Sequence, residues 1–179
     1  MSRAVIHTLG PAGTNCEAAA WHWLQQRGYS GGEVELHSTL EQAVPAVLRS
    51  PKSGILLACI VYPQLNELVF RNLAKMALRE CFTMPTHPMV LAAPKAGHIG
   101  LVLSHPAPAS LLDGRGVLIK MANSNSAAAI DCAKGLSDAC ITTKIAAEAN
   151  GLLIIEDFGA VPMGFSIHVP YGSEVWPDE

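Results

Sequence analysis

Charged residues of both signs are scarce in this chain. Of its 179 residues 15% are charged, and the formal net charge at pH 7 is −3. No run of lysine and arginine and no stripe of basic and aromatic residues occurs, so nucleic acid is not expected as a partner. Half of the residues are hydrophobic, which is enough for a sizeable core and argues against global disorder.

Long hydrophobic runs are also missing. The longest, Ile55–Tyr62, is far shorter than the roughly 20 residues that cross a bilayer, so we expect no membrane contact. The N-terminus enters a strand-like run without the apolar segment of a signal peptide. These absences predict a cytoplasmic protein.

Patterns for disulfides and metals are absent as well. The five cysteines form no Cys-x-x-Cys pair, and an odd number of them favours reduced thiols. Cys16 lies in the first turn of an expected helix, where a thiol pKa can fall, so it is either a nucleophile or a small buried residue. No spacing of His, Cys, Asp or Glu resembles a zinc or iron site, and we predict no metal and no cofactor.

Short apolar runs alternate with helical stretches along the chain. The expected strands are Ala4–Leu9, Val34–Leu36, Ile55–Val61, Met89–Ala92, Ile99–Leu103, Val117–Lys120, Ala139–Thr142, Leu152–Ile155 and Met163–Val169. The expected helices are Thr14–Arg27, Thr39–Leu48, Ala107–Leu112, Ser126–Lys134 and Lys144–Asn150. This alternation predicts an α/β fold with helices on the faces of a sheet. Pro85 and Pro88 are expected to break regular structure between Cys81 and Met89, where the chain would cross between lobes.

The stretch Leu9–Ala20, LGPAGTNCEAAA, places a glycine-containing loop between a strand and a helix. Gly13 permits close approach of a ligand, and the free N–H groups of a helix start favour an anion. Neither G-x-x-x-x-G-K-[ST] nor G-x-G-x-x-G occurs, so a small carboxylate fits better than a nucleotide. The alternative is an ordinary capped turn.

Three further polar loops follow expected strands, at Ser104–Pro106, Asn123–Ser126 and Thr142–Lys144. Because ligands of open α/β sheets lie at the carboxyl ends of strands, we expect these loops to share one pocket. Each side chain could instead serve as a helix cap. The candidate substrate-binding residues are Gly13, Thr14, Asn15, Ser104, Ser124, Asn125, Ser126, Thr142, Lys144 and, from the resemblance described next, Gly164.

Two stretches carry a resemblance to a known family. LGPAGTNCEAAA and GLSDACITTKIAAEANGLLIIEDFG resemble segments of prephenate dehydratases, and the match covers nearly the whole chain. The resemblance implies their catalytic domain, a two-lobed α/β fold of the type II periplasmic-binding-protein class with the active site in the cleft. It places residues 1–78 and 152–179 in lobe 1 and residues 79–151 in lobe 2. No residues remain for the regulatory ACT domain.

The chain departs from the dehydratases at the residues that matter most. Their Thr-Arg-Phe motif, which supplies an acid for the departing hydroxyl and a cation for a carboxylate, reads Met163-Gly164-Phe165 here. Methionine and glycine side chains can neither donate a proton nor pair with an anion. Their Pro-x-Glu-Asn-Ser motif is also missing. We therefore do not expect ordinary dehydratase activity.

A narrower branch resembles the chain more closely, the non-aromatising prephenate decarboxylases of bacilysin and related natural-product pathways. LGPAGT, SHPAP, NSNSAAA, GLSDA and the Pro-Met of VPMGFS are similar to that branch. The resemblance implies loss of CO2 with retention of the ring hydroxyl, in antibiotic biosynthesis and without a cofactor. Met163 and Phe165 would form an apolar wall, and His105 is the first choice of proton donor, although it could instead only hydrogen-bond substrate or backbone.

Two other functions remain open. A related enzyme of tropone or tropodithietic acid biosynthesis would act on a ring carboxylate or thioester. A non-catalytic small-acid-binding protein would use the same scaffold without turnover. In each case the partner is a small cyclic carboxylate. Trp21 and Trp23 cannot both face one core, so one of them is expected at a contact between lobes or between subunits, the latter in a homodimer.

Overall fold

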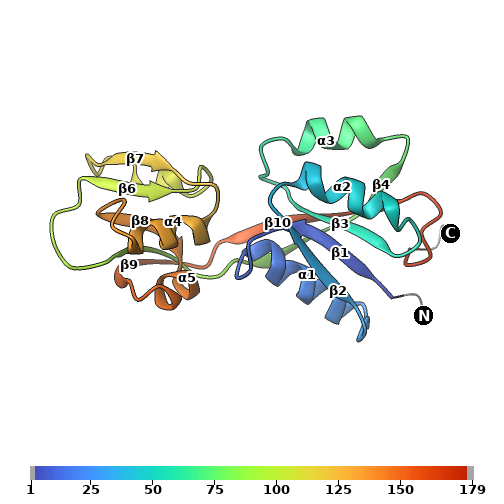
Figure 1. Cartoon of the computed structure of the whole chain (residues 1–179), viewed down its shortest axis with the longest axis horizontal. Coiled ribbons are helices and arrows are strands. Elements are labelled where there is room, and N and C mark those ends of the chain that lie inside the picture. The colour runs from blue at the N-terminus through green and yellow to red at the C-terminus, as the bar shows by residue number, and fades with distance from the viewer. Residues whose placement is uncertain (1–2, 177–179) are drawn as a thin grey trace. The chain divides into compact units, whose positions relative to one another are not determined.

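The computed structural model describes residues 3–176, which divide into two compact units (Figure 1). Unit 1 comprises Met1–Met84 and Met163–Glu179, and unit 2 comprises Pro85–Pro162. Both boundaries lie later in the sequence than predicted. The first is later because strand β4, Met76–Pro85, belongs to the sheet of unit 1. The second is later because strand β9, Leu153–Gly159, pairs with a strand of unit 2.

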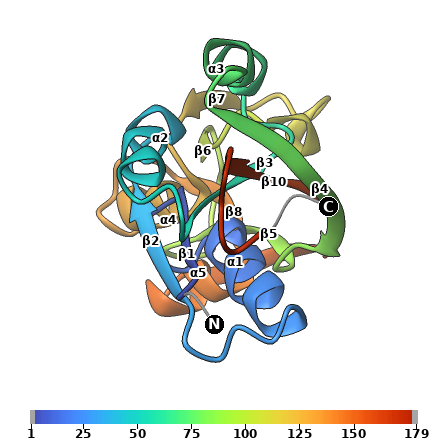
Figure 2. The ribbon, with the colours of Figure 1, turned by 90° about the vertical axis from the view of Figure 1, so that its right-hand side faces the viewer.

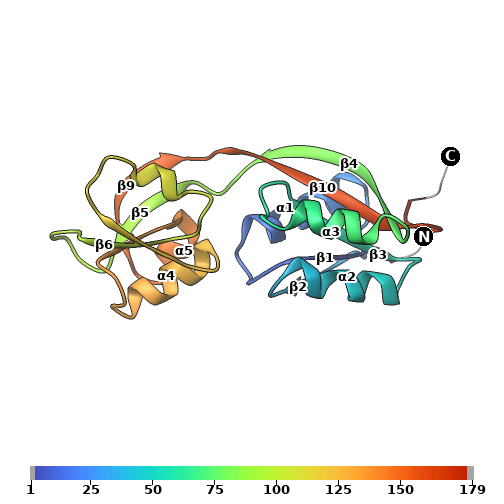
Figure 3. The same cartoon turned by 90° about the horizontal axis from the view of Figure 1, so that it is seen from above.

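Unit 1 contains one mixed five-stranded sheet with helices on both faces. Its elements are β1 Val5–Leu9, α1 Asn15–Gln26, β2 Glu33–His37, α2 Leu40–Arg49, β3 Gly54–Cys59, α3 Leu65–Asn72, β4 and β10 Pro162–Pro170. The strand order is β2-β1-β3-β10-β4, with β1 parallel to β2 and β3, and β10 antiparallel to β3. Helices α1 and α2 lie on opposite faces of this sheet (Figure 2). The long strands β4 and β10 run side by side (Figure 3).

The two faces of this sheet follow from the alternation of side chains along each strand. Ile55 and Leu57 of β3 pack with Phe165 in the core on the α1 side. Leu56, which lies between them, packs with residues of α2 on the other side. Unit 1 therefore has two apolar layers, and its strands end at loops beside the helix starts.

Unit 2 contains a second mixed five-stranded sheet. Its elements are β5 Met89–Ala93, β6 Leu101–Ser104, the 3-10 helix η1 Ala109–Leu112, β7 Leu118–Met121, α4 Asn125–Ala133, β8 Ala139–Thr143, α5 Lys144–Ala149 and β9. The order is β7-β6-β8-β5-β9. Because β6 is parallel to both β7 and β8, the carboxyl ends of these three strands lie at one edge of the sheet.

All nine strands and five helical segments expected from the sequence are present, with shifted ends. The helix predicted at Ala107–Leu112 is a short 3-10 helix over Ala109–Leu112. Helix α3 and strand β4 were not predicted. The predicted break before Met89 is present but shorter than expected: β4 continues past Cys81 to Pro85, and only residues 86–88 separate it from β5, next to the boundary between the units. Proline is tolerated there since β4 is an edge strand and Pro85 is its last residue.

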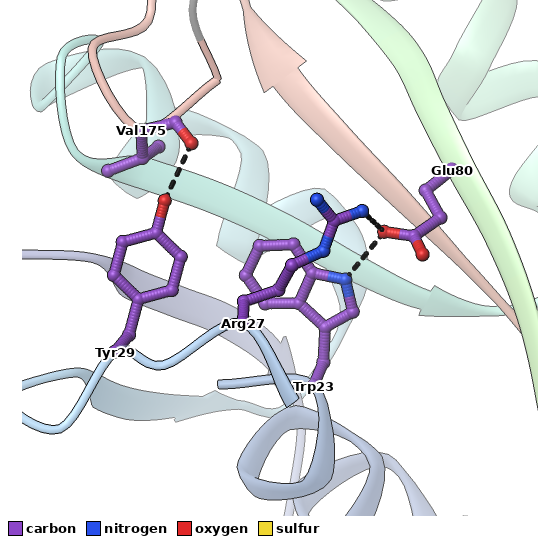
Figure 4. A network of polar contacts seen from close by, with 5 residues as sticks. All are labelled: Trp23, Arg27, Tyr29, Glu80 and Val175. Carbon is purple, nitrogen blue, oxygen red and sulfur yellow. Dashed lines mark hydrogen bonds and ion pairs between the residues drawn. The ribbon is translucent and has the colours of Figure 1, made fainter. Parts of the chain in front are cut away.

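The two neighbouring tryptophans of α1 differ in environment as expected. Trp21 is 48% exposed, whereas Trp23 is 3% exposed. The Trp23 indole N–H donates to Glu80 of β4 over 2.8 Å, and the same carboxylate oxygen accepts from Arg27 over 2.7 Å (Figure 4). These contacts join α1 to the edge strand of unit 1. None of the helices in residues 3–176 combines the length and apolarity that crossing a membrane requires.

Candidate functional site

The predicted site residues are divided between the two units. In unit 1, Thr14 is the N-cap of α1, and its Oγ1 accepts the Glu17 N–H over 3.3 Å. Gly13 has a φ of +80°, in the left-handed region that favours glycine. Its N–H donates to Glu17 Oε2 over 2.5 Å. At Gly13, the side chain of Glu17 therefore takes the place of the predicted anionic ligand. Asn15 is the first residue of α1.

The start of β10 carries the residues that replace the dehydratase motif. Met163 is partly buried against the α1-side core. A Cβ at Gly164 would collide with the side chain of Ile60, so this side chain lies directly over Gly164. Ile60 is 53% exposed, so the surface at this position is apolar. Phe165 is 0% exposed and stacks on Phe82 with ring centroids 5.6 Å apart. The prediction that Phe165 forms a wall toward a ligand is therefore wrong, because this ring fills the core of unit 1.

Unit 2 brings the three predicted polar loops together at one edge of its sheet. The Ala122 N–H donates to the Ser104 carbonyl over 2.9 Å, which joins the loops after β6 and β7. The Thr142 hydroxyl donates to the Asn125 carbonyl over 2.7 Å, which joins the end of β8 to the start of α4. These three loops are therefore neighbours within unit 2, and the expectation that they form one pocket stays a prediction.

Several hydroxyl groups of these loops have internal partners. Ser104 is 0% exposed and donates to the His105 carbonyl over 2.9 Å. Thr142 is also 0% exposed. Ser124 is the N-cap of α4 and is buried, as is Ser126. The predicted role in ligand contact is therefore corrected for Ser104 and Thr142, which hold the loops in place.

Asn125 differs from these residues because one of its polar atoms lacks a partner. Its Oδ1 is buried and accepts no hydrogen bond from any residue in the described range 3–176. Its amide nitrogen lies 3.9 Å from the sulfur of Met89. A buried acceptor without a donor is costly, so a ligand hydroxyl at this position would be favoured over a carboxylate.

His105 directly follows β6 and is partly buried. Its Nδ1 accepts the N–H of Ala107 over 3.3 Å, which leaves the proton of the neutral ring on Nε2. Burial lowers the pKa of His105 below its ordinary value of 6.5. Both features favour a neutral imidazole that donates from Nε2 over a protonated ring that acts as an acid near neutral pH.

Lys144 places a cation at this edge, at the start of α5. Its backbone N–H donates to the Pro88 carbonyl over 2.8 Å, which fixes the start of α5. Its Nζ lies 3.8 Å from an oxygen of Asp157, and both side chains are more than two-fifths exposed. Such an exposed pair is weak, so Lys144 can exchange Asp157 for an anionic ligand.

Sequence reasoning missed a group of three side chains in unit 1. His7 Nδ1 lies 3.1 Å from His37 Nε2 and 3.3 Å from Glu35 Oε2. The two histidines are 30 positions apart, so no local spacing reveals them. Burial lowers the pKa of His7, Glu35 raises it, and His37 and Arg49 lower it further.

The cysteines are free thiols, as expected, and Cys16 is buried with 7% exposure. The neighbouring Cys59 and burial raise its pKa well above the ordinary value. Of the two interpretations of Cys16, the structure supports the small buried residue.

The fold is that of the two-lobed α/β proteins of the periplasmic-binding-protein class. A structure titled as a periplasmic transporter matches 96% of this chain and 77% of its own with a TM-score of 0.60 and 11% identity. The structure of GqqA, titled a novel type of quorum quenching acylase, matches 98% of this chain and 67% of its own with a TM-score of 0.65 and 18% identity. These likenesses define the fold, as the sequence predicted.

In sequence, the chain is similar to proteins named prephenate decarboxylase. The protein of Bacillus subtilis strain 168 is 27% identical over 173 residues, covering 90% of this chain and 84% of the relative. The protein of Planktothrix agardhii is 28% identical over 177 residues, covering 91% and 86%. No family model matches the chain. The relatives are those that the sequence motifs predicted.

Proposed function

We propose that this chain is a prephenate decarboxylase that forms a non-aromatic product in antibiotic biosynthesis. The similarity to prephenate decarboxylases of Bacillus and Planktothrix over about nine-tenths of the chain carries this proposal. The reaction releases the ring carboxylate as CO2. The electron pair of the broken bond moves into the ring diene, and a proton is added to a ring carbon, while the ring hydroxyl is kept.

The start of β10 supports retention of that hydroxyl. Met163 offers no acid that could protonate a leaving hydroxide, and Gly164 lies under the apolar side chain of Ile60. An arginine at position 164 would have to displace Ile60. This strand therefore promotes neither aromatisation by dehydration nor strong binding of a second carboxylate.

The loops of unit 2 supply groups that suit the remaining polar atoms of such a substrate. We assign the neutral His105 Nε2–H and the exposed Lys144 ammonium to a carboxylate. The amide of Asn125, whose Oδ1 has no partner among the described residues, is assigned to a substrate hydroxyl, and because Oδ1 is buried this partly exposed side chain must turn toward the substrate to form the bond. No residue is then required as acid, and the proton added to the ring comes from solvent. No cofactor is part of this proposal.

Incubation of the protein with prephenate tests the proposed reaction. We expect release of CO2 together with a product that lacks the absorbance of an aromatic ring. Brisk formation of phenylpyruvate, or no turnover at all, would contradict the proposal. Tight binding without turnover would instead identify a binding protein.

A substitution at Met163 tests the reason for the product. Met163→Thr introduces into β10 the hydroxyl donor that dehydratases have at this position. Because this donor can protonate the departing hydroxide, we expect a larger fraction of phenylpyruvate among the products. Met163→Leu is the matched control, since it keeps the volume without a donor and should leave the product ratio unchanged. An unchanged ratio in both variants would show that this position does not direct the outcome.

A further inference from the structure

The group formed by His7, Glu35 and His37 lies outside the loops assigned to substrate. These residues come from the neighbouring parallel strands β1 and β2, whose register pairs His7 with Glu35 and Leu9 with His37. Glu35 and His37 are two positions apart on β2, so their side chains point to the same face of the sheet. His7 is 4% exposed, so its ring is held by packing.

The separations of the polar atoms fit one metal ion. One candidate ligand atom from each residue lies within 4.8 Å of the other two. A tetrahedral zinc ion bound at about 2.0–2.1 Å by nitrogen or oxygen places its ligand atoms about 3.3 Å apart. The distances of 3.1 Å from His7 Nδ1 to His37 Nε2 and 3.3 Å to Glu35 Oε2 are close to that spacing.

The chemistry of the set indicates the class of ion. Two imidazoles and one carboxylate suit divalent ions such as zinc, cobalt and nickel, and the set has no thiolate that would favour Cu(I). Three protein ligands leave the fourth position of a tetrahedral ion open. The Glu35 side chain is 56% exposed, so an ion can reach the group from solvent.

We propose that His7, Glu35 and His37 form a binding site for one divalent transition-metal ion. None of these three residues is assigned to the substrate, whose proposed polar contacts His105, Asn125 and Lys144 belong to unit 2. The His37 carbonyl accepts the N–H of Gly10 over 2.8 Å, which ties the end of β2 to the loop before α1. A bound ion would therefore also stabilise this part of unit 1.

Binding can be measured with Co²⁺ and Zn²⁺ on the full chain, prepared without a polyhistidine tag and treated with a chelator. We expect one ion per chain by calorimetry and the visible absorbance of tetrahedral Co²⁺. His37→Ala and Glu35→Gln should each weaken binding by at least about 10- to 100-fold, since losing a partner that only orients a ligand already costs that much. Both residues are less buried than His7, so these variants should fold.

His22→Ala and Glu33→Gln are the matched controls. His22 is exposed on α1, and Glu33 lies on β2 beside Arg3, outside the proposed group. Both controls should bind Co²⁺ like the unmodified chain. Absence of binding in the unmodified chain, or equal affinity in Glu35→Gln and Glu33→Gln with unchanged circular dichroism, would overturn the site.

Discussion

His105 offers a test of catalysis at the scale of one residue. Because its lowered pKa keeps the ring neutral above pH 6.5, we expect kcat/KM to stay level from that pH to about pH 8. His105→Gln places an amide N–H near the Nε2 position and should retain most activity. His105→Ala removes a hydrogen bond to a charged group, worth about 1.5–3 kcal/mol, and should lower kcat/KM about 10- to 100-fold.

The exposed His98 provides the control for this experiment, and His98→Gln should leave kcat/KM unchanged. Activity that instead falls as the pH rises through a pKa below 6.5, and is lost in His105→Gln, would identify His105 as the proton donor.

His168 offers a test of stability. This residue of β10 is 4% exposed, and burial lowers its pKa from 6.5 to about 4. Between these values the unfolded chain binds a proton that the folded chain does not. Stability should therefore fall as the pH falls from about 6.5 to about 4, by on the order of 3 kcal/mol from this residue.

Urea unfolding at several pH values measures this dependence on pH. His168→Gln lacks the titrating ring, so its free energy of unfolding should depend less steeply on pH in the same range. An identical slope in the variant would show that His168 does not contribute.

At the scale of elements, Thr14 and Thr39 form a matched pair. Each is the N-cap of a helix in unit 1 and accepts a backbone N–H at 3.3 Å and 3.2 Å, respectively. Replacing either threonine by alanine should cost about 1 kcal/mol of stability. If the loop before α1 also binds substrate, Thr14→Ala should raise KM for prephenate and Thr39→Ala should not. Equal KM values in the two variants would mean that Thr14 serves only as a helix cap.

The elements that the sequence predicted well are those with strong local signals. Thr39 and Asn150 were expected as helix boundaries, and the structure confirms both, with Gly151 at a φ of +66°. Strand β4 was missed because its apolar and polar residues do not alternate regularly, and few of them are buried, since the strand lies at a sheet edge. Its neighbour β10 was found because it is a continuous buried run.

The candidate site was predictable in position more than in the role of each side chain. Spacing after strands located the loops of unit 2, yet it could not show that Thr142 bonds to a backbone carbonyl or that Phe165 is buried. Those roles depend on which way each side chain turns. The His7, Glu35 and His37 group was missed for another reason, since it depends on strand register.

At the scale of the whole molecule, unit 1 is built from both ends of the chain. The Tyr171 N–H donates to the Lys75 carbonyl over 3.1 Å, and the Tyr29 hydroxyl donates to the Val175 carbonyl over 2.8 Å (Figure 4). The segment after β10 is thus joined to segments that precede unit 2 in sequence. Unit 1 therefore requires the return of the chain from unit 2 before its sheet is complete.

The Glu80 carboxylate allows the two units to be distinguished by experiment. It accepts hydrogen bonds from Trp23 and Arg27, and its side chain is 28% exposed. Glu80→Ala leaves a largely buried indole N–H unpaired, so we expect a loss of about 1–3 kcal/mol in unit 1. Amide hydrogen exchange should then be faster in α1 and β4 but unchanged in the sheet of unit 2.

Glu67→Ala is the control for Glu80→Ala. Glu67 forms an exposed ion pair with Arg71 one helical turn away, and such pairs contribute about 0.3–0.5 kcal/mol. Its loss should barely change exchange anywhere. If Glu80→Ala accelerates exchange equally in both units, they unfold as one cooperative body. Faster exchange confined to unit 1 means that each sheet, with its own apolar layers, is an independent unit of stability.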